Sequence, residues 1–161
     1  MGTRSDIIVK LANGQWKRIY CHWDGYLSHN GKILFEHYNS QKKAEALVKH
    51  GDLSSLDEKC SKPHGHSFDF RVNGYCVYYG RDRGEKNTEG HTGASLESVW
   101  PSADTWTEFT YIWDGEKWFV SDPDNKANVF PLNAALEAAE AGGSPIKSFI
   151  KSPLGTLGKR T

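Results

Sequence analysis

Residues 6–20 read Asp-Ile-Ile-Val-Lys-Leu-Ala-Asn-Gly-Gln-Trp-Lys-Arg-Ile-Tyr, and they carry the first strong structural signal of the chain. The run from Asp6 to Leu11 is rich in β-branched residues, which favour a strand. The turn Ala12-Asn13-Gly14 follows, and Asn and Gly adopt positive φ at little cost. The chain then returns from Trp16 to Tyr20. This stretch therefore predicts an antiparallel hairpin.

A second hairpin is predicted around Asp114-Gly115. An Asp-Gly pair between two apolar runs is the clearest hairpin signal in the sequence. The flanking runs are residues 109–113 and 117–120. Trp113 and Trp118 stand on either side of the turn, so we expect them to pair across the hairpin.

Three segments carry helix signals. Apolar residues recur at helical spacing within residues 31–38. Ser40 suits the N-cap of a helix from Gln41 to His50, and Gly51 suits its end. Pro131 suits a first helical position, and the residues after it place Leu and Ala on one buried face.

These elements predict an α+β fold. A further apolar run at residues 75–79 adds a strand between the two hairpins. Strand–helix alternation is absent, which argues against a doubly wound sheet. We therefore expect a small antiparallel sheet of about five strands, with two to three helices packed on one of its faces.

The length of 161 residues fits one domain. We expect residues 1–143 to form this α+β domain. Residues 144–161 are rich in Ser, Pro, Gly and Lys, which predicts a flexible C-terminal tail. Within the domain, residues 52–74 look irregular, and residues 84–107 form a polar stretch that suits a mobile loop.

Composition excludes several classes of protein. Lys plus Arg and Asp plus Glu both number 20, so the charge balance is not that of a general nucleic-acid binder. No apolar run is long enough for a membrane span, and the amino terminus lacks the apolar core of a secretory signal. The 3 cysteines show no regular spacing. These features predict a reduced cytosolic setting without a disulfide framework.

Residues 20–26, Tyr-Cys-His-Trp-Asp-Gly-Tyr, form the densest functional segment. If the preceding strand continues, His22 and Asp24 face the same side, and Asp24 could orient His22 as a general base. The other interpretation is structural: His22 caps a loop and Asp24 closes the following turn. No nucleophile-elbow pattern accompanies the pair.

Residues 79–85, Tyr-Gly-Arg-Asp-Arg-Gly-Glu, form a second dense segment after an apolar strand. On a continued strand Arg81 and Arg83 would share one side, and guanidinium groups bind phosphate or carboxylate through two parallel hydrogen bonds. The alternative is an ion network inside the loop, in which Asp82 and Glu85 already pair with both arginines.

Because both segments leave strands of one small sheet through a glycine, we expect them to form one site. A free arginine there, with Trp23 or Tyr26 as a stacking face, would suit a phosphate-bearing ligand. The predicted ligand-binding residues are Tyr20, His22, Trp23, Asp24, Tyr26, Arg81, Arg83 and Glu85.

No metal or cofactor is predicted. Cys60, His64 and His66 lie close together, and zinc accepts such ligands. However, there is no Cys-x-x-Cys pair, and the two histidines lie in a loop. The phosphate-loop and dinucleotide fingerprints are also missing, which argues against ATP hydrolysis and hydride transfer.

Trp100 and Trp106 lie in or beside the long polar stretch. If they are exposed, they suit a partner interface, where Trp often dominates binding energy. The alternative is that they fold back and cover the sheet.

Six segments together resemble a family of small, mostly uncharacterised proteins of bacteriophages and related mobile elements. They are Thr3-Arg-Ser5, Ile19-Tyr-Cys-His-Trp-Asp-Gly-Tyr26, His37-Tyr38, Gly51-Asp-Leu-Ser-Ser-Leu56, Arg81-Asp-Arg-Gly-Glu85 and Phe109-Thr-Tyr-Ile-Trp-Asp-Gly-Glu-Lys-Trp118. The resemblance covers roughly residues 3–135 and differs at Leu27, where relatives often have Pro. It implies a phage accessory protein in the cytoplasm of the infected bacterium, and it supplies no catalytic residues.

Two functions follow from these features. The first is an anti-defence protein that binds a host component, either a defence protein or a nucleotide-derived signal, without catalysis. The second is a small hydrolase or transferase acting on a phosphorylated or nucleotide substrate, with His22 as general base and Asp24 as its orienting partner. A virion or packaging component is a third option without a specific feature. The partner is expected to be neither general nucleic acid nor a membrane, and a homo-oligomer is left open.

Overall fold

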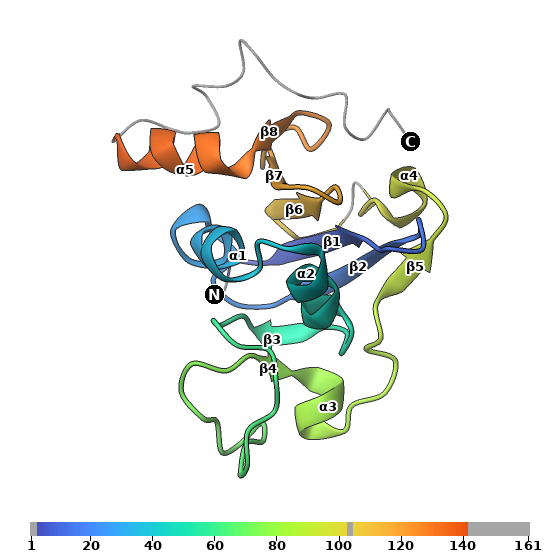
Figure 1. Ribbon diagram of the computed structural model, residues 1–161, viewed down its shortest axis with the longest axis vertical. Coiled ribbons are helices and arrows are strands. Elements are labelled where there is room, and N and C mark those ends of the chain that lie inside the picture. Colours follow the sequence, from blue (N-terminus) through green and yellow to red (C-terminus); the bar gives the residue numbers. More distant parts are fainter. Residues whose placement is uncertain (1–2, 103–104, 142–161) are drawn as a thin grey trace.

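The computed structural model describes residues 3–102 and 105–141. At its centre is one sheet of 8 strands, in the order β4-β3-β2-β1-β6-β7-β8, with β5 beside β2. Figure 1 shows this sheet running through the molecule. The strands are β1 (Ser5–Lys10), β2 (Trp16–Cys21), β3 (Leu53–Ser55), β4 (Val77–Tyr78), β5 (His91–Gly93), β6 (Phe109–Trp113), β7 (Trp118–Ser121) and β8 (Val129–Pro131).

Both predicted hairpins are confirmed. β1 and β2 pair antiparallel, with Asp6 opposite Tyr20. β6 and β7 pair antiparallel around the Asp114-Gly115 turn, and Trp113 lies opposite Trp118 with ring centroids 5.6 Å apart. Aromatic cross-strand pairs of this kind stabilise a hairpin.

The prediction of a small antiparallel sheet of about five strands is wrong. The sheet is mixed, because β1 pairs parallel with β6 and β2 pairs parallel with β3. Three of its strands, β3, β5 and β8, have only 3 residues each. Runs this short show no alternation of apolar and polar residues, so the sequence pattern does not reveal them.

The predicted helices form at the expected places. α2 (Gln41–Val48) begins after Ser40, whose Oγ accepts a hydrogen bond of 3.3 Å from the backbone N–H of Lys43. α1 (Lys32–His37) follows a π-helical turn at Leu27–Gly31, and α5 (Leu132–Glu140) starts directly after Pro131.

Two short helices were not predicted. α4 (Leu96–Val99) and β5 lie inside residues 84–107, which were expected to form a polar loop. α3 (Tyr79–Arg83) starts where the strand was expected to continue, so the arginines of this segment lie on a helix. The predicted tail, residues 144–161, lies outside the described residues.

The helices cover both faces of the sheet, not one as predicted. Leu34 of α1, Leu47 of α2 and Ala135 of α5 pack with Ile7 in the larger buried cluster. Leu96 and Val99 of α4 pack with Ile8 in a smaller cluster. Because Ile7 and Ile8 are neighbours on one strand, these clusters lie on opposite faces. Figure 1 shows α1 and α2 over the sheet and α4 beyond the end of β1 and β2.

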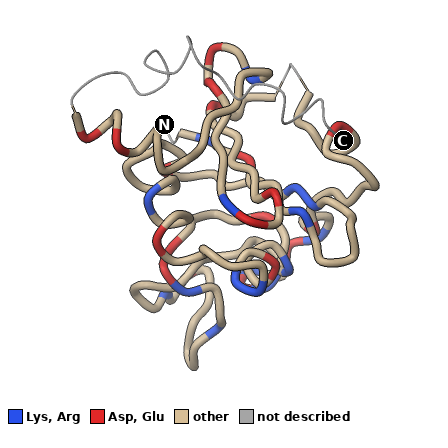
Figure 2. Tube along the Cα trace, turned by 45° about the horizontal axis from the view of Figure 1, so that its top comes forward, with Lys and Arg blue, Asp and Glu red and all other residues tan. Residues whose placement is uncertain are grey.

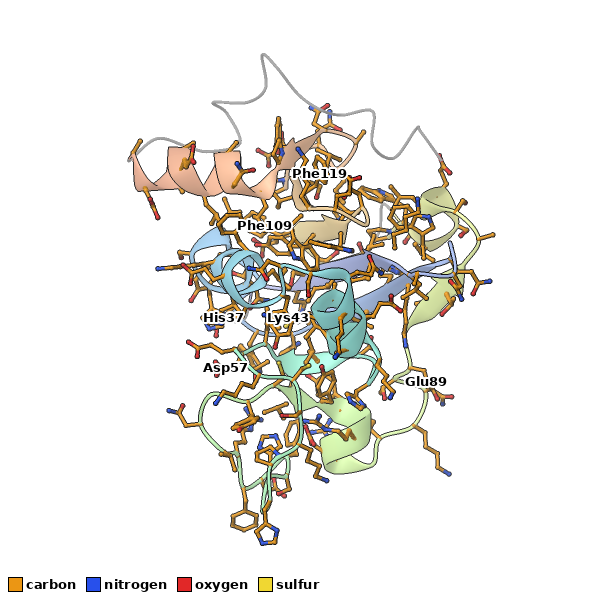
Figure 3. The ribbon with its side chains drawn as sticks, viewed as in Figure 1. His37, Lys43, Asp57, Glu89, Phe109 and Phe119 are labelled. Carbon is orange, nitrogen blue, oxygen red and sulfur yellow. The ribbon has the colours of Figure 1, made fainter. Side chains whose placement is uncertain are left out.

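The strands β6 and β7 also contribute side chains to both clusters. Phe109 of β6 packs against the larger cluster, whereas Phe119 of β7 belongs to the smaller one. Figure 3 labels both side chains on the β6–β7 hairpin. The face that carries the smaller cluster is only partly filled by apolar side chains, and its remaining area holds the polar groups described below.

Acidic and basic residues are intermingled over the fold (Figure 2). None of the helices in residues 3–102 and 105–141 has the length and apolar character that a membrane span requires. The predicted division into a domain of residues 1–143 and a tail remains a prediction.

Candidate functional site

The first dense segment does not form the predicted His–Asp pair. β2 ends at Cys21, and Asp24 has a φ of 57°, so alternation of faces does not extend to His22 and Asp24. His22 Nδ1 instead lies 2.8 Å from the hydroxyl of Tyr20. In the described part of the chain no hydrogen bond or ion pair joins His22 to Asp24. The Asp24 carboxylate acts on Tyr26, whose pKa it raises.

Several residues of this segment have structural roles. Tyr111 donates a hydrogen bond of 2.6 Å to the carbonyl oxygen of Gly25, whose N–H donates to the carbonyl of Thr3 at 2.7 Å. Asn30 is fully buried, and its amide nitrogen lies 3.4 Å from Cys21 Sγ. These contacts fasten the segment to the amino-terminal strand. They account for much of its chemical density without a ligand.

The aromatic side chains of the segment remain open to solvent. Trp23 is 41 % exposed and Tyr26 is 40 % exposed. His22 meets the Trp23 ring edge-on at 4.6 Å between centroids. Burial, followed by the charge of Arg4, lowers the pKa of His22 below its usual value. The role of Trp23 and Tyr26 in binding stays a prediction.

Arg81 is committed to the protein itself. Its Nε and Nη2 donate to both carboxylate oxygens of Asp82, at 2.8 and 3.1 Å. Nη1 donates to the carbonyl of Cys60 at 2.7 Å. Asp82 is buried, which raises its pKa, but hydrogen bonds from Arg81 and the N–H of Tyr78 bring this pKa below the usual value. Arg81 therefore holds the 60–76 loop against α3.

Arg83 is also paired. It donates to the carboxylate of Glu85 and lies over the rings of Phe68 and Tyr79, at 4.2 and 5.1 Å from their centroids. Both arginines thus take part in the internal ion network that was the alternative to a free anion clamp. Neither arginine of residues 79–85 is therefore free to bind a ligand together with residues 20–26.

The two dense segments lie on either side of β3. Cys21 of β2 pairs with Leu53, which pairs in turn with Tyr78 of β4. Asp52 joins both segments, because its Oδ1 accepts from the N–H of Tyr20 at 2.9 Å and its carbonyl accepts from the N–H of Tyr79 at 3.2 Å. Among the described residues, no hydrogen bond, ion pair or ring contact joins residues 22–26 to residues 81–85.

A polar cavity that the sequence did not predict opens on the sheet face of the smaller apolar cluster. Its volume is about 290 Å³. We refer to it as the Arg18 pocket. Its lining residues come from β1, β2, β5 and two connecting segments, and they are Asp6, Arg18, Ile19, Tyr20, Asp52, His91, Thr105, Trp106 and Thr107. Of the predicted site residues, only Tyr20 lines it.

Asp6 forms the floor of the Arg18 pocket. Its side chain is only 3 % exposed, and Oδ2 accepts a hydrogen bond of 2.6 Å from Thr107 Oγ1. Lys126 Nζ donates to the same Thr107 oxygen at 3.2 Å. Burial raises the pKa of Asp6 above its usual value, against the opposing effects of Thr107 and of the positive charge of Arg18. Burial likewise raises the pKa of Asp52.

Arg18 is the residue of the pocket that carries a buried donor without a partner in the described part of the chain. It stands on β2 in register with His91 of β5. Its Nε is buried and has no hydrogen-bond partner among the described residues, and the same holds for Thr110 Oγ1, which is beside Asp6 in the sheet. A buried donor without a partner costs about 1–3 kcal/mol. An acceptor supplied by a ligand would remove that cost.

The rim of the pocket carries an aromatic face and a second guanidinium. Trp106 is 80 % exposed, so it does not cover the sheet, whereas Trp100 packs against the smaller cluster. The Arg4 guanidinium lies 5.9 Å from the centroid of the Trp106 ring. Burial raises the pKa of Tyr20, and the nearby charge of Arg4 opposes that rise. Arginine and aromatic groups therefore meet here, but from residues other than those predicted.

One sequence signal could have indicated this pocket. Asp6 directly precedes the apolar run of β1, Thr110 interrupts the apolar run of β6, and both are almost fully buried. A polar group at such a position needs a partner on its own face. Thr107 supplies the partner of Asp6, whereas Thr110 Oγ1 has none among the described residues. Pairing over such a distance along the chain depends on the parallel contact of β1 with β6.

A larger hollow, of about 400 Å³, lies between α1 and α5 and is lined by residues such as Phe35, Glu36, Leu136 and Glu140. It contains no buried polar atom without a partner among the described residues. The Arg18 pocket is therefore the stronger candidate site.

Within residues 3–102 and 105–141, no group of three or more His, Cys, Asp or Glu side chains is placed to hold a metal ion. Comparisons of the chain with protein-family models, with curated proteins and with solved structures give no match.

Proposed function

We propose that this chain is a phage accessory protein that binds a nucleotide-like small molecule of the infected bacterium without transforming it. The ligand would occupy the Arg18 pocket. One observation carries the proposal: Arg18 lines this polar cavity, and its buried Nε lacks a hydrogen-bond acceptor in the described residues. Burying such a donor is unfavourable unless a bound group satisfies it.

The groups around Arg18 suit a nucleotide better than a purely anionic ligand. The carboxylates of Asp6 and Asp52 offer acceptors, Arg18 offers donors, and Trp106 offers an exposed aromatic face. A nucleobase carries both donors and acceptors on its edge and a π-face on which Trp can stack. Arg4 at the rim could pair with a phosphate.

The phage setting comes from the resemblance of the sequence segments, which also suggests that the protein acts in the host cytoplasm. Sequestering a nucleotide-derived defence signal would fit a small protein that acts stoichiometrically, with each copy binding ligand and releasing no product. Binding of a host defence protein is the other form of this function, and the exposed Trp23 and Tyr26 would suit it.

Catalysis with His22 as general base is the second candidate. Its support is the 2.8 Å contact between His22 Nδ1 and the hydroxyl of Tyr20, which lines the pocket. A proton could pass from Tyr20 to His22. Asp24 would not orient the imidazole in this arrangement, because its carboxylate acts on Tyr26. Burial also raises the pKa of Tyr20, which disfavours loss of its proton.

Calorimetric titration with a panel of nucleosides, nucleotides and cyclic dinucleotides tests the proposal. We expect at least one of these compounds to bind the wild-type protein and to be recovered unchanged after prolonged incubation. Arg18→Met should abolish this binding. Arg83→Met is the matched control, because it removes a guanidinium that is already paired with Glu85, and it should bind normally.

Two results would contradict the proposal. If no compound of the panel binds, the Arg18 pocket is not a nucleotide site. If a compound is converted to product by the wild-type protein and not by His22→Gln, the enzyme interpretation replaces the binding one, since general-base catalysis is worth about 10²–10⁴-fold in rate.

A further inference from the structure

The geometry points to guanine as the base that enters the Arg18 pocket. This inference rests on the proposed function and names its ligand more closely. Three features of the pocket carry it: its volume, the separate placement of its donor and acceptor groups, and the aromatic face at its rim.

The volume limits how much of a ligand can enter. Pockets for small ligands usually span about 300–1,000 Å³. At about 290 Å³, the Arg18 pocket lies at the lower end of this range. It therefore suits one base-sized group, while the sugar and phosphates of a nucleotide would remain at the rim. Recognition inside the pocket would then read the edge of the base.

Donor and acceptor groups are held apart in the pocket. Burial raises the pKa of Asp52, and the N–H of Tyr20 and the nearby charges of His91 and Arg18 oppose that rise. No ion pair or hydrogen bond joins Arg18 to Asp52 in the described residues, and Arg18 Nε keeps its donor unused. Oppositely charged groups that are close without touching leave room for a ligand that contacts both.

The carboxylate of Asp52 is placed to accept hydrogen bonds from such a ligand. The N–H of Tyr20 donates to Oδ1 and fixes the carboxylate at the pocket wall. An ionised carboxylate accepts several hydrogen bonds through its two oxygens, so Oδ2 retains capacity. The ligand edge that meets Asp52 must therefore present N–H donors, and the edge that meets Arg18 must present acceptors.

Guanine meets both requirements on adjoining edges. Its O6 and N7 atoms accept from an arginine, which is the commonest specific arginine–base contact. Its N1–H and N2 amino group donate side by side and match the two oxygens of a carboxylate. Adenine would turn the lone pair of N1 toward Asp52, and its N6 amino group would turn a donor toward Arg18. Trp106 can stack on the purine, and Arg4 stands beside it for a phosphate.

The experiment compares guanosine with adenosine by calorimetric titration of the wild-type protein. We expect guanosine to bind at least about 10-fold more tightly, since one good bidentate contact discriminates between bases by about this factor or more. Inosine lacks the N2 amino group and should bind more weakly than guanosine. Guanosine methylated at N1 should not bind, because its methyl group replaces the donor that meets Asp52.

Asp52→Asn tests the protein side of the contact. The asparagine oxygen can still accept from the N–H of Tyr20, but its amide replaces the free carboxylate oxygen. We expect a loss of guanosine affinity of about 10-fold or more. Glu89→Gln is the matched control, because the charge of this carboxylate acts on Asp52 although Glu89 does not line the pocket. Figure 3 shows Glu89 on the segment that leads to β5.

The outcomes separate this inference from the proposed function. Equal affinity for guanosine and adenosine would overturn the guanine assignment and leave a nucleotide-binding pocket in place. Tight binding of inosine or of the N1-methylated compound would overturn it as well, whether or not Asp52→Asn folds. Absence of binding for every nucleoside and nucleotide would reject both statements.

Discussion

Thr107 Oγ1 donates a hydrogen bond of 2.6 Å to Oδ2 of Asp6, and the two residues are 101 positions apart in the sequence. This contact closes the segment before β6 over the first strand of the sheet. It places Trp106 at the rim of the Arg18 pocket and leaves a carboxyl group almost fully buried beneath it. Much of the candidate site thus depends on one long-range contact.

The buried Asp6 carboxyl group should make stability depend on pH. Burial raises its pKa in the folded protein, so the folded state holds this proton more tightly than the unfolded state. Its contribution to the free energy of unfolding is therefore complete below about pH 3.9 and is lost as pH rises through the folded pKa. Asp6→Asn removes this pH-dependent contribution to the free energy of unfolding, because asparagine does not titrate. Urea unfolding between about pH 4 and 7 should show Asp6→Asn gaining stability relative to wild type as pH rises. A constant difference across that range would show that Asp6 does not titrate as described.

Arg81 should be needed for stability. Arg81→Met leaves the buried Asp82 carboxylate without its two charge-assisted hydrogen bonds, and breaking a buried pair costs about 3–5 kcal/mol. Arg83→Met is the control, because the Arg83–Glu85 pair is largely exposed and worth at most about 1 kcal/mol. Denaturant titration of both variants measures the difference. Equal losses would mean that Arg81 does not anchor the 60–76 loop.

Gly51→Ala should be far more damaging than Gly14→Ala. Both glycines have positive φ, at +83° and +88°, where an L-residue costs about 1–2 kcal/mol. At Gly51 an added Cβ would also lie 2.0 Å from the carbonyl oxygen of Thr88, whereas at Gly14 it meets open space. The Thr88 carbonyl cannot withdraw freely, since it accepts from the N–H of Asp52. Thermal unfolding should show a modest loss for Gly14→Ala and a large one for Gly51→Ala. Similar melting temperatures for the two would contradict this placement of residue 88.

The three cysteines should differ in reactivity. Burial raises the pKa of the Cys21 and Cys76 thiols to about 12, so neither forms a thiolate at neutral pH. Cys60 is only partly buried, and its pKa is raised as well. Iodoacetamide at about pH 8 should label Cys60 slowly and leave Cys21 and Cys76 unmodified, as judged by mass spectrometry of peptides. Guanidinium-unfolded protein serves as the control, with all three cysteines labelled at similar rates. Rapid labelling of Cys21 in the folded protein would show that the segment after β2 opens in solution.

Local features of the chain were predictable because they depend on neighbouring residues. The Asn13-Gly14 and Asp114-Gly115 turns, the pairing of Trp113 with Trp118 and the Ser40 cap all follow from backbone preferences over a few positions. The same reasoning failed after Tyr78. The strand β4 ends at Tyr78 and the helix α3 starts at the next residue. Hydrogen bonds from Arg81 and from the N–H of Tyr78 to Asp82 favour this helix.

By itself, the sequence determined two hairpins, three of the helices and the presence of chemically dense segments. Tertiary structure decided which groups meet. Parallel pairing of β1 with β6 and of β2 with β3 brings together strands that no turn connects, so no local pattern specifies their register. That register sets Asp6 beside Thr110 and Cys21 beside Leu53. It also assembles the pocket from Asp6, Arg18, Asp52 and Trp106. Burial is the physical reason, because only packing of distant strands removes Arg18 Nε and the Asp6 carboxyl group from water.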